Sequence, residues 1–121
     1  MIERLVDGIG GNVIALVAHG QVSHKDYELV VFPAVKEMTE IHGKVRLFFQ
    51  LGDDFTGYTA EAIWDDAKVG TKYFNAFEKI AVVSDVAWIA QAVRIFRVLV
   101  PCPVEIFPNN ALLTALHWIV E

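Results

Sequence analysis

The stretch that decides the fold is residues 77–100, which read FEKIAVVSDVAWIAQAVRIFRVLV. The short apolar run at 79–84 is rich in β-branched residues and predicts a strand that is covered on both faces. Asp85 follows at once and predicts the N-terminal cap of a helix that continues to about Leu99. Pro101 then ends this helix, because proline lacks the backbone N–H that a further turn needs. A buried strand followed directly by a helix is the repeating unit of a parallel sheet.

The same alternation extends in both directions from this segment. Further strands are predicted at 2–7, 13–18, 44–51 and 104–107, and further helices at 23–41, 59–74 and 111–120. The order ββαβαβαβα favours an α/β fold, with a mostly parallel five-stranded sheet, an antiparallel N-terminal edge strand and helices on both faces. We expect residues 1–121 to form a single domain of this kind.

Several local signals mark where these elements turn or bend. The glycines at 8–12 predict a hairpin turn between the first two strands. Ser23 predicts the N-cap of the first helix, and Pro33 inside that helix predicts a kink. Residues 52–57 predict a loop, because glycine and aspartate dominate them, and Thr59 predicts the N-cap of the next helix.

Composition and charge exclude several classes of protein. Hydrophobic residues make up 55% of the chain and charged residues 21%, with a mean hydropathy of +0.41, which excludes a disordered or collagen-like chain. The formal net charge is −5 and the basic residues are scattered, so we expect no nucleic acid partner. The single Cys102 cannot form an internal disulfide, which fits a reducing compartment.

No segment predicts a signal peptide or a membrane-spanning helix. The longest apolar stretch runs from Val86 to Val100, and Gln91, Arg94 and Arg97 interrupt it. A spanning helix needs about 20 predominantly apolar residues. We therefore expect a cytoplasmic protein, and a peripheral location at the inner face of the membrane is the alternative that stays open.

A candidate ligand site lies at the carboxyl ends of the parallel strands, where ligands of open α/β sheets usually bind. The predicted connections at this edge offer aromatic rings and a few polar groups, a mixture that suits a lipid or another small amphipathic ligand. The candidate residues are Asp54, Phe55, Tyr58, Trp64, Ser84, Asp85, Trp88 and Asn109. Alternatively, the polar residues cap helices and the aromatic residues belong to the core. A cavity near Tyr58, Trp64 and Trp88 would favour the ligand site.

The acidic pair Asp65–Asp66 does not predict a metal site. Adjacent helix residues point about 100° apart, so these carboxylates converge poorly on one cation. A solvated acidic face, with Asp65 pairing to Lys68 or Lys72, is the preferred interpretation. Ser84 lacks the glycine-flanked motif of a serine nucleophile, and none of the four histidines lies in a catalytic motif. We expect no metal ion, no cofactor and no catalytic residue.

The helix predicted after Asp85 is apolar over most of its circumference. A helix on one side of a sheet buries only part of its surface, so the remainder should face a neighbouring helix, a twin subunit, a ligand tail or a membrane interface. The predicted interface or membrane patch consists of Ile89, Val93, Phe96, Val100 and Trp118. Homodimerisation, or packing of the two C-terminal helices on each other, is the preferred interpretation.

The sequence also resembles the bacterial SpoIIAA-like family of small STAS-fold proteins, and the resemblance covers essentially the whole chain. The segments that carry it are Phe32–Ala34, Lys44–Leu47, Trp64–Asp66, Phe77–Asp85 with Trp88, Phe107 and Ala115–Trp118. The resemblance implies a fold shared with lipid-binding CRAL-TRIO domains. It further implies a non-catalytic module with a pocket for a lipid or small ligand, peripheral membrane association and dimers.

The chain departs from the regulatory STAS proteins at one position. Those proteins carry a phosphorylatable serine at the start of the helix that follows the third strand, and residues 53–59 contain no serine. Thr56 or Thr59 could take its place, yet turn and N-cap roles explain both. The first hypothesis is therefore a ligand- or lipid-binding module, and the alternative is a STAS-type protein–protein regulatory module.

Overall fold

The framework of the fold is a five-stranded sheet with strand order β1-β2-β3-β4-β5. The computed structural model describes residues 1–5 and 10–121. Within these residues β1 runs antiparallel to β2, and the other neighbouring strands are parallel, so the predicted α/β fold is confirmed. The strands are β1 (Ile2–Leu5), β2 (Val13–Val22), β3 (Val45–Tyr58), β4 (Phe77–Val83) and β5 (Val104–Phe107).

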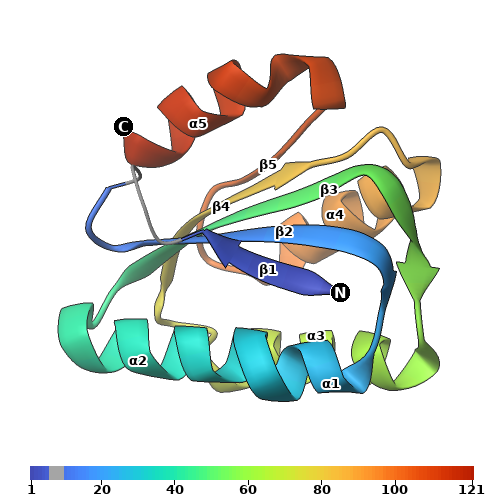
Figure 1. Ribbon diagram of the computed structural model, residues 1–121. Coiled ribbons are helices and arrows are strands. Elements are labelled where there is room, and N and C mark those ends of the chain that lie inside the picture. The colour runs from blue at the N-terminus through green and yellow to red at the C-terminus, as the bar shows by residue number, and fades with distance from the viewer. Residues whose placement is uncertain (6–9) are drawn as a thin grey trace.

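Helices cover both faces of the sheet, with α5 on one face and α1 to α4 on the other (Figure 1). The larger apolar cluster lies beneath the latter group, and a smaller cluster lies beneath α5. The helices are α1 (His24–Asp26), α2 (Phe32–His42), α3 (Ala60–Lys72), α4 (Ala87–Leu99) and α5 (Leu112–Val120).

Strand β2 contributes to both clusters, because successive residues of a strand point to opposite faces of the sheet. Ile14 and Leu16 belong to the larger cluster, and Val13 and Ala15 belong to the smaller one. The central strands are therefore buried on both faces, which explains why their sequences are apolar almost without interruption.

Strand β3 is longer than predicted. Residues 52–57, predicted as a loop, continue the strand to Tyr58 and pair with the second half of β2. Gly20 and Gly57 have φ values of 60° and 141° in this region, and the strand register shifts beside Gly20. Hydrogen bonds to β2 hold the extension, and this pairing between distant residues leaves no local signal in a segment rich in glycine and aspartate.

The first predicted helix forms, with a change of hydrogen-bonding pattern before its proline. Ser23 is the N-cap residue, as predicted, and its backbone N–H donates to Asp26 Oδ2 at 2.8 Å. A π-helical turn at Tyr27–Val31 separates α1 from α2, and Pro33 lies in the first turn of α2. Because proline cannot donate an i→i−4 hydrogen bond, the wider turn accommodates it without ending the helix.

The hairpin turn predicted at 8–12 and the end of the first predicted strand fall partly outside the described residues. The strand predicted at 104–107 forms as β5. Among residues 1–5 and 10–121, no helix combines the length and the apolar character that crossing a bilayer requires.

Candidate functional site

Aromatic residues from β3 and α4 form a cluster at the carboxyl edge of the sheet. The ring centroids of Phe55 and Tyr58 are 5.6 Å apart, those of Tyr58 and Trp88 are 6.0 Å apart, and those of Phe55 and Trp88 are 6.4 Å apart. The structure therefore brings together three of the predicted ligand-binding residues. Their rings pack on one another, and Phe55 and Tyr58 also pack on the core.

Tyr27 lies next to this aromatic cluster, and its place in an apolar helix pattern carried no signal of a polar role. The side chain is fully buried, with its ring centroid 6.5 Å from that of Tyr58. Its hydroxyl donates to Asp66 Oδ1 at 2.6 Å. Burial raises the pKa of both tyrosines, so the hydroxyls stay protonated at neutral pH.

Asp65 corrects the prediction of a solvated acidic face. Its side chain is 2% exposed, and its Oδ2 lies 2.7 Å from Nδ1 of His24. Lys68 Nζ lies 3.8 Å from its Oδ1, so the predicted pairing with Lys68 is present. The packing of α3 against α1 buries this carboxylate, and a residue 41 positions away supplies its main partner.

The polar candidates near β4 and β5 contact one another or the backbone. Ser84 Oγ accepts a hydrogen bond from the backbone N–H of Val86 at 3.1 Å. Asp85 Oδ1 accepts from the backbone N–H of Asn109 at 2.9 Å, and Asn109 Nδ2 donates to Asp53 Oδ1 at 3.2 Å. The prediction that Asp85 caps α4 is wrong, because the helix begins one residue later, with Val86 as its N-cap residue.

Two further candidates do not join the aromatic cluster. Asp54 Oδ2 lies 2.9 Å from Nδ1 of His19, whose Nε2 lies 3.3 Å from Glu3 Oε1, so these contacts connect β1, β2 and β3. The hydrogen bond that the protonated His19 ring donates to Asp54 is the main cause of a raised pKa at His19. Trp64 is 71% exposed on α3 and contributes no ring to the aromatic pairs of this cluster.

The two threonines considered as phosphorylation sites have different surroundings. Thr59 Oγ1 accepts a hydrogen bond from the backbone N–H of Ala62 at 3.2 Å, so Thr59 is the N-cap of α3, as predicted. Thr56 is exposed on β3. Of the two, Thr56 is the residue whose modification would leave the cap of α3 in place.

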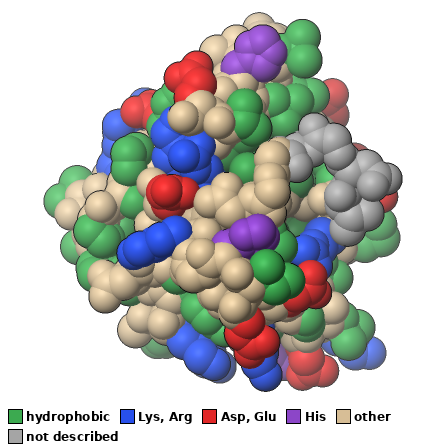
Figure 2. Space-filling view, turned by 90° about the vertical axis from the view of Figure 1, so that its left-hand side faces the viewer, with side chains coloured by type: hydrophobic (Ala, Val, Ile, Leu, Met, Phe, Trp, Pro, Cys, Tyr) green, Lys and Arg blue, Asp and Glu red, His purple; other side chains and the backbone are tan. Residues whose placement is uncertain are grey.

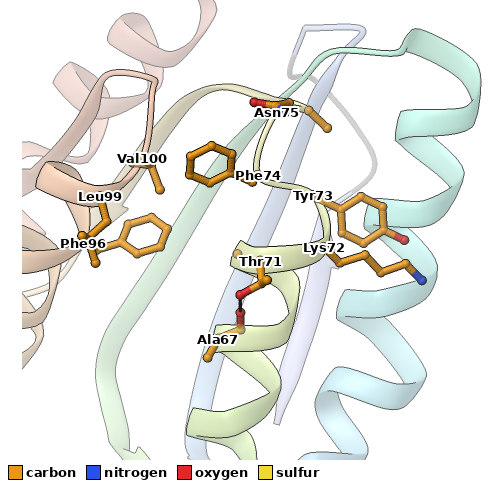
Figure 3. A pocket seen from close by; sticks show the side chains of 11 residues that line it. Ala67, Thr71, Lys72, Tyr73, Phe74, Asn75, Phe96, Leu99 and Val100 are labelled. Carbon is orange, nitrogen blue, oxygen red and sulfur yellow. Dashed lines mark hydrogen bonds between the residues drawn. The ribbon is translucent and has the colours of Figure 1, made fainter.

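A groove of about 740 Å³ lies between the C-terminal turns of α3 and α4, near the amino end of β4 (Figure 3). Phe96, Leu99 and Val100 border this α3–α4 groove from one side, and Phe74 borders it from the connection to β4. This groove lies at the opposite edge of the sheet from the aromatic cluster, and the cavity predicted near Tyr58, Trp64 and Trp88 stays a prediction. The rest of the lining is Ala67, Gly70, Thr71, Lys72, Tyr73, Asn75 and Ala76.

A second groove, of about 540 Å³, lies between α2 and α3. Three lysines, one glutamate and four apolar or aromatic residues line this α2–α3 groove. The lining residues are Glu28, Phe32, Pro33, Lys36, Lys68, Val69, Lys72 and Tyr73. The two grooves share Lys72 and Tyr73, so they meet at the C-terminal end of α3.

The exposed apolar face of α4 differs from the predicted patch. Ile89 and Val93 are buried against the sheet, and Phe96 and Val100 pack partly against the same core. The large apolar residues of α4 that are exposed are Trp88, Ile95, Val98 and Leu99. Because α4 is apolar on several sides, its sequence did not determine which side faces the sheet.

Trp118, the fifth residue of the predicted patch, is half-buried on α5. Its ring centroid lies 5.8 Å from that of Phe107, and the Nζ of Lys79 lies 4.3 Å from the Trp118 centroid. Trp118 therefore packs at the border of the smaller apolar cluster, with a cation over its ring.

The charged side chains on one end of the molecule are interspersed rather than clustered by sign, as Figure 2 shows. Arg46 pairs with Glu78 at 3.1 Å, and Arg97 pairs with Glu105 at 3.0 Å. This distribution differs from the clustered Lys and Arg side chains that bind the phosphates of nucleic acids.

Three further polar features concern possible metal ligands, the cysteine thiol and one buried amide oxygen of the described residues. No three His, Cys, Asp or Glu side chains in that part converge as metal ligands would. Cys102 is half-buried against the larger cluster, and burial raises the pKa of its thiol. The Oδ1 atom of Asn109 is buried without a hydrogen-bond partner among these residues.

Comparisons with known proteins agree with this fold. The chain is similar to an uncharacterized protein from the DUF3478 family with a SpoIIAA-like fold from Shewanella loihica PV-4. The two share 23% sequence identity and a TM-score of 0.76, over 98% of this chain and 93% of the other. No curated protein matches the sequence. The family profile described as SpoIIAA-like matches residues 13–120, and the chain therefore belongs to the SpoIIAA-like family.

Proposed function

We propose that this chain is a non-catalytic module that binds a lipid or another small amphipathic molecule, with the apolar part of the ligand in the α3–α4 groove. The SpoIIAA-like fold is that of a binding or regulatory module in general. The observation that carries the finer proposal is an apolar groove of about 740 Å³ at the end of two helices. Ligand sites commonly have volumes of about 300–1,000 Å³ and mostly apolar linings.

The lining of the α3–α4 groove is suited to an acyl chain. Phe74, Phe96, Leu99 and Val100 supply apolar surface, and each methylene group that moves from water onto such surface contributes about 0.8 kcal/mol when fully buried. Gly70 helps to shape the groove, because a Cβ atom at this position would lie 3.4 Å from the Phe96 ring. The missing side chain lets this ring lie close to the backbone of α3.

The carboxyl edge of the sheet supports ligand binding less well. Phe55, Tyr58 and Trp88 pack on one another there, and the polar groups of Ser84 and Asp85 accept hydrogen bonds from backbone N–H groups. A ligand at this edge would have to separate these rings, which pack edge-to-face or at a tilt. The α3–α4 groove needs no such rearrangement.

Exposed apolar residues on α4 extend the proposed site toward solvent. Leu99 is 67% exposed and also borders the groove, and Ile95 and Val98 lie on the same helix. Exposed apolar surface of this kind marks a contact with a membrane or another protein. The proposal includes peripheral contact of α4 with a bilayer, from which a lipid would enter the groove.

The test fills the groove without disturbing the core. Ala67→Trp places a large side chain in the groove from an exposed helix position, and Ala60→Trp places the same side chain at the exposed start of α3. Titration with dodecanol, followed by calorimetry, should give weaker binding to Ala67→Trp by about tenfold or more, since several methylene contacts are lost. Ala60→Trp should bind like the wild type.

Two results would contradict the proposal. One is a wild-type protein that neither binds dodecanol nor carries an apolar molecule when native mass spectrometry is applied after purification. The other is equal binding of dodecanol by the wild type and both variants, which would place the ligand elsewhere. Circular dichroism spectra of both variants establish that the fold is retained.

A further inference from the structure

The α2–α3 groove concentrates positive charge on a molecule whose formal net charge is −5. Lys36, Lys68 and Lys72 line it, against the single carboxylate of Glu28. Glu28 already contacts the Nε2 atom of His24 at 3.2 Å. The groove therefore carries an excess of positive charge that the overall composition does not predict.

The ammonium groups of this groove are largely free to bind an anion. Within residues 1–5 and 10–121, neither Lys36 nor Lys72 belongs to an ion pair. Lys68 lies 3.8 Å from Asp65, and its side chain is 69% exposed, so this contact is a weak surface pair. Ammonium groups bind carboxylate and phosphate oxygens through strong charge-assisted hydrogen bonds.

The surface between the lysines is apolar. Phe32, Pro33, Val69 and Tyr73 contribute to it, and the π-helical turn at Tyr27–Val31 lies directly before the α2 wall of the groove. Single π-helical turns of this kind occur frequently at functional sites. The combination of an apolar wall with cationic ends fits a molecule that has both an apolar body and an acidic group.

The two grooves are adjacent at the end of α3. Lys72 and Tyr73 border both, and Figure 3 shows these side chains extending toward α2, whereas Phe74 and Phe96 lie on the side of α4. A chain-like ligand in the α3–α4 groove would therefore meet the lysines where it passes the end of α3.

We infer that the ligand of this protein is a free single-chain amphiphile with an acidic head group, and that Lys36, Lys68 and Lys72 of the α2–α3 groove bind this group. The inference rests on the proposed function and adds the chemical class of the ligand. It separates the roles of the grooves: the α3–α4 groove holds the apolar chain, and the α2–α3 groove selects the acid.

Dodecanoate and dodecanol form a matched pair of probes, since they share one chain length and differ in the charged group. The variant Lys36→Gln/Lys72→Gln removes two positive charges from the groove. The control Lys25→Gln/Arg94→Gln removes two exposed positive charges outside both grooves, so both variants have the same net charge. Calorimetry at low salt below the critical micelle concentration gives the affinities.

The wild type and the control should bind dodecanoate about tenfold more tightly than dodecanol, which corresponds to two or three surface charge pairs. The Lys36→Gln/Lys72→Gln variant retains only Lys68 of the three lysines and should lose most of the preference for dodecanoate. Added salt should remove the preference of the wild type. Equal binding of both probes by the wild type would overturn this inference while leaving the proposed function intact. If the wild type binds neither dodecanoate nor dodecanol, both this inference and the proposed function are overturned.

A vesicle experiment distinguishes a free amphiphile from a bilayer. Co-sedimentation is measured with vesicles of phosphatidylcholine containing phosphatidylglycerol, for the wild type and both double variants. Binding of dodecanoate that depends on Lys36 and Lys72 supports the inference. If the dependence on these lysines occurs with vesicles and not with dodecanoate, the acidic group belongs to a membrane surface, and the inference of a free ligand is overturned.

Discussion

The contact between His24 and Asp65 joins two helices through one charged hydrogen bond. The Nδ1 atom of His24 lies 2.7 Å from the buried Asp65 carboxylate, and the carboxylates of Glu28 and Glu61 lie 3.2 and 3.9 Å from the ring nitrogens. The hydrogen bond to Asp65 is the main cause of a raised pKa at His24. Protonation of this single side chain is therefore coupled to the packing of α1 on α3.

Replacing His24 should change how stability depends on pH. The folded-state pKa lies above the ordinary value of 6.5, so the protonated ring stabilises the fold fully below about pH 6.5, and this contribution disappears as the pH rises through the folded-state pKa. Thermal unfolding should show a larger loss of Tm for His24→Gln at about pH 5.5 than at about pH 8.5. His42→Gln, at an exposed position, is the control; a loss of equal size at both pH values would contradict the prediction.

Tyr27 offers a second test at the residue scale. Tyr27→Phe removes the hydroxyl that donates to Asp66 at 2.6 Å and leaves the ring in place. We expect a loss of about 1–3 kcal/mol in the free energy of unfolding, because the carboxylate loses a buried partner. Urea denaturation measures it, with Tyr73→Phe at a groove wall as the control. Equal stability of the two variants would show that the Asp66 contact contributes nothing.

The elements of the fold differ in how far local sequence predicts them. The start of α3 is determined by neighbouring residues, because Thr59 caps the helix by accepting a hydrogen bond from the N–H of Ala62, three residues away. The second half of β3 is not local, because residues 52–57 form a strand through pairing with β2. The π-helical turn before Pro33 is partly predictable from local sequence. The proline predicts that the regular helix is interrupted there, but it does not predict that the interruption is a π-helical turn.

Two threonines of α3 allow the contribution of a capping side chain to stability to be compared with that of a threonine inside the helix. Thr59→Ala removes the cap and should cost about 1 kcal/mol of unfolding free energy. Thr71→Ala removes a hydroxyl that bonds back to the Ala67 carbonyl at 2.8 Å within the helix, and alanine favours helix more than threonine does, so stability should stay constant or rise slightly. Urea denaturation measures both. A loss at Thr71 as large as that at Thr59 would contradict the assignment of the cap.

On the scale of the whole molecule, the surplus of apolar residues leaves an exposed row on α4. Val98 is 82% exposed, Ile95 is 68% exposed and Leu99 is 67% exposed. The side of α4 that packs against the sheet consists of other residues, among them Ile89 and Val93. This distribution favours contact of α4 with a further surface. A second copy of the chain would cover the row when no bilayer is present.

If two copies of the chain associate through this row, a single charged side chain placed in the row should prevent the association. We expect sedimentation velocity at micromolar concentrations to show a dimer for the wild type and a monomer for Val98→Asp. Thr114→Asp, at an exposed position on α5, is the matched control and should remain a dimer. A wild type that is monomeric over the whole concentration range would exclude this use of the α4 surface.

The sequence by itself determined the order of strands and helices, the parallel sheet with one antiparallel edge, and the caps at Ser23 and Thr59, because these features depend on neighbouring residues. It also indicated that Phe55, Tyr58 and Trp88 share one edge, since the carboxyl ends of parallel strands meet there. Only the tertiary structure decided that these rings pack on each other, that Asp65 is buried beside His24, and which side of α4 is exposed. The positions of both grooves belong to the same group, because each lies between helices that pack on the sheet at angles and depths set by contacts between distant residues.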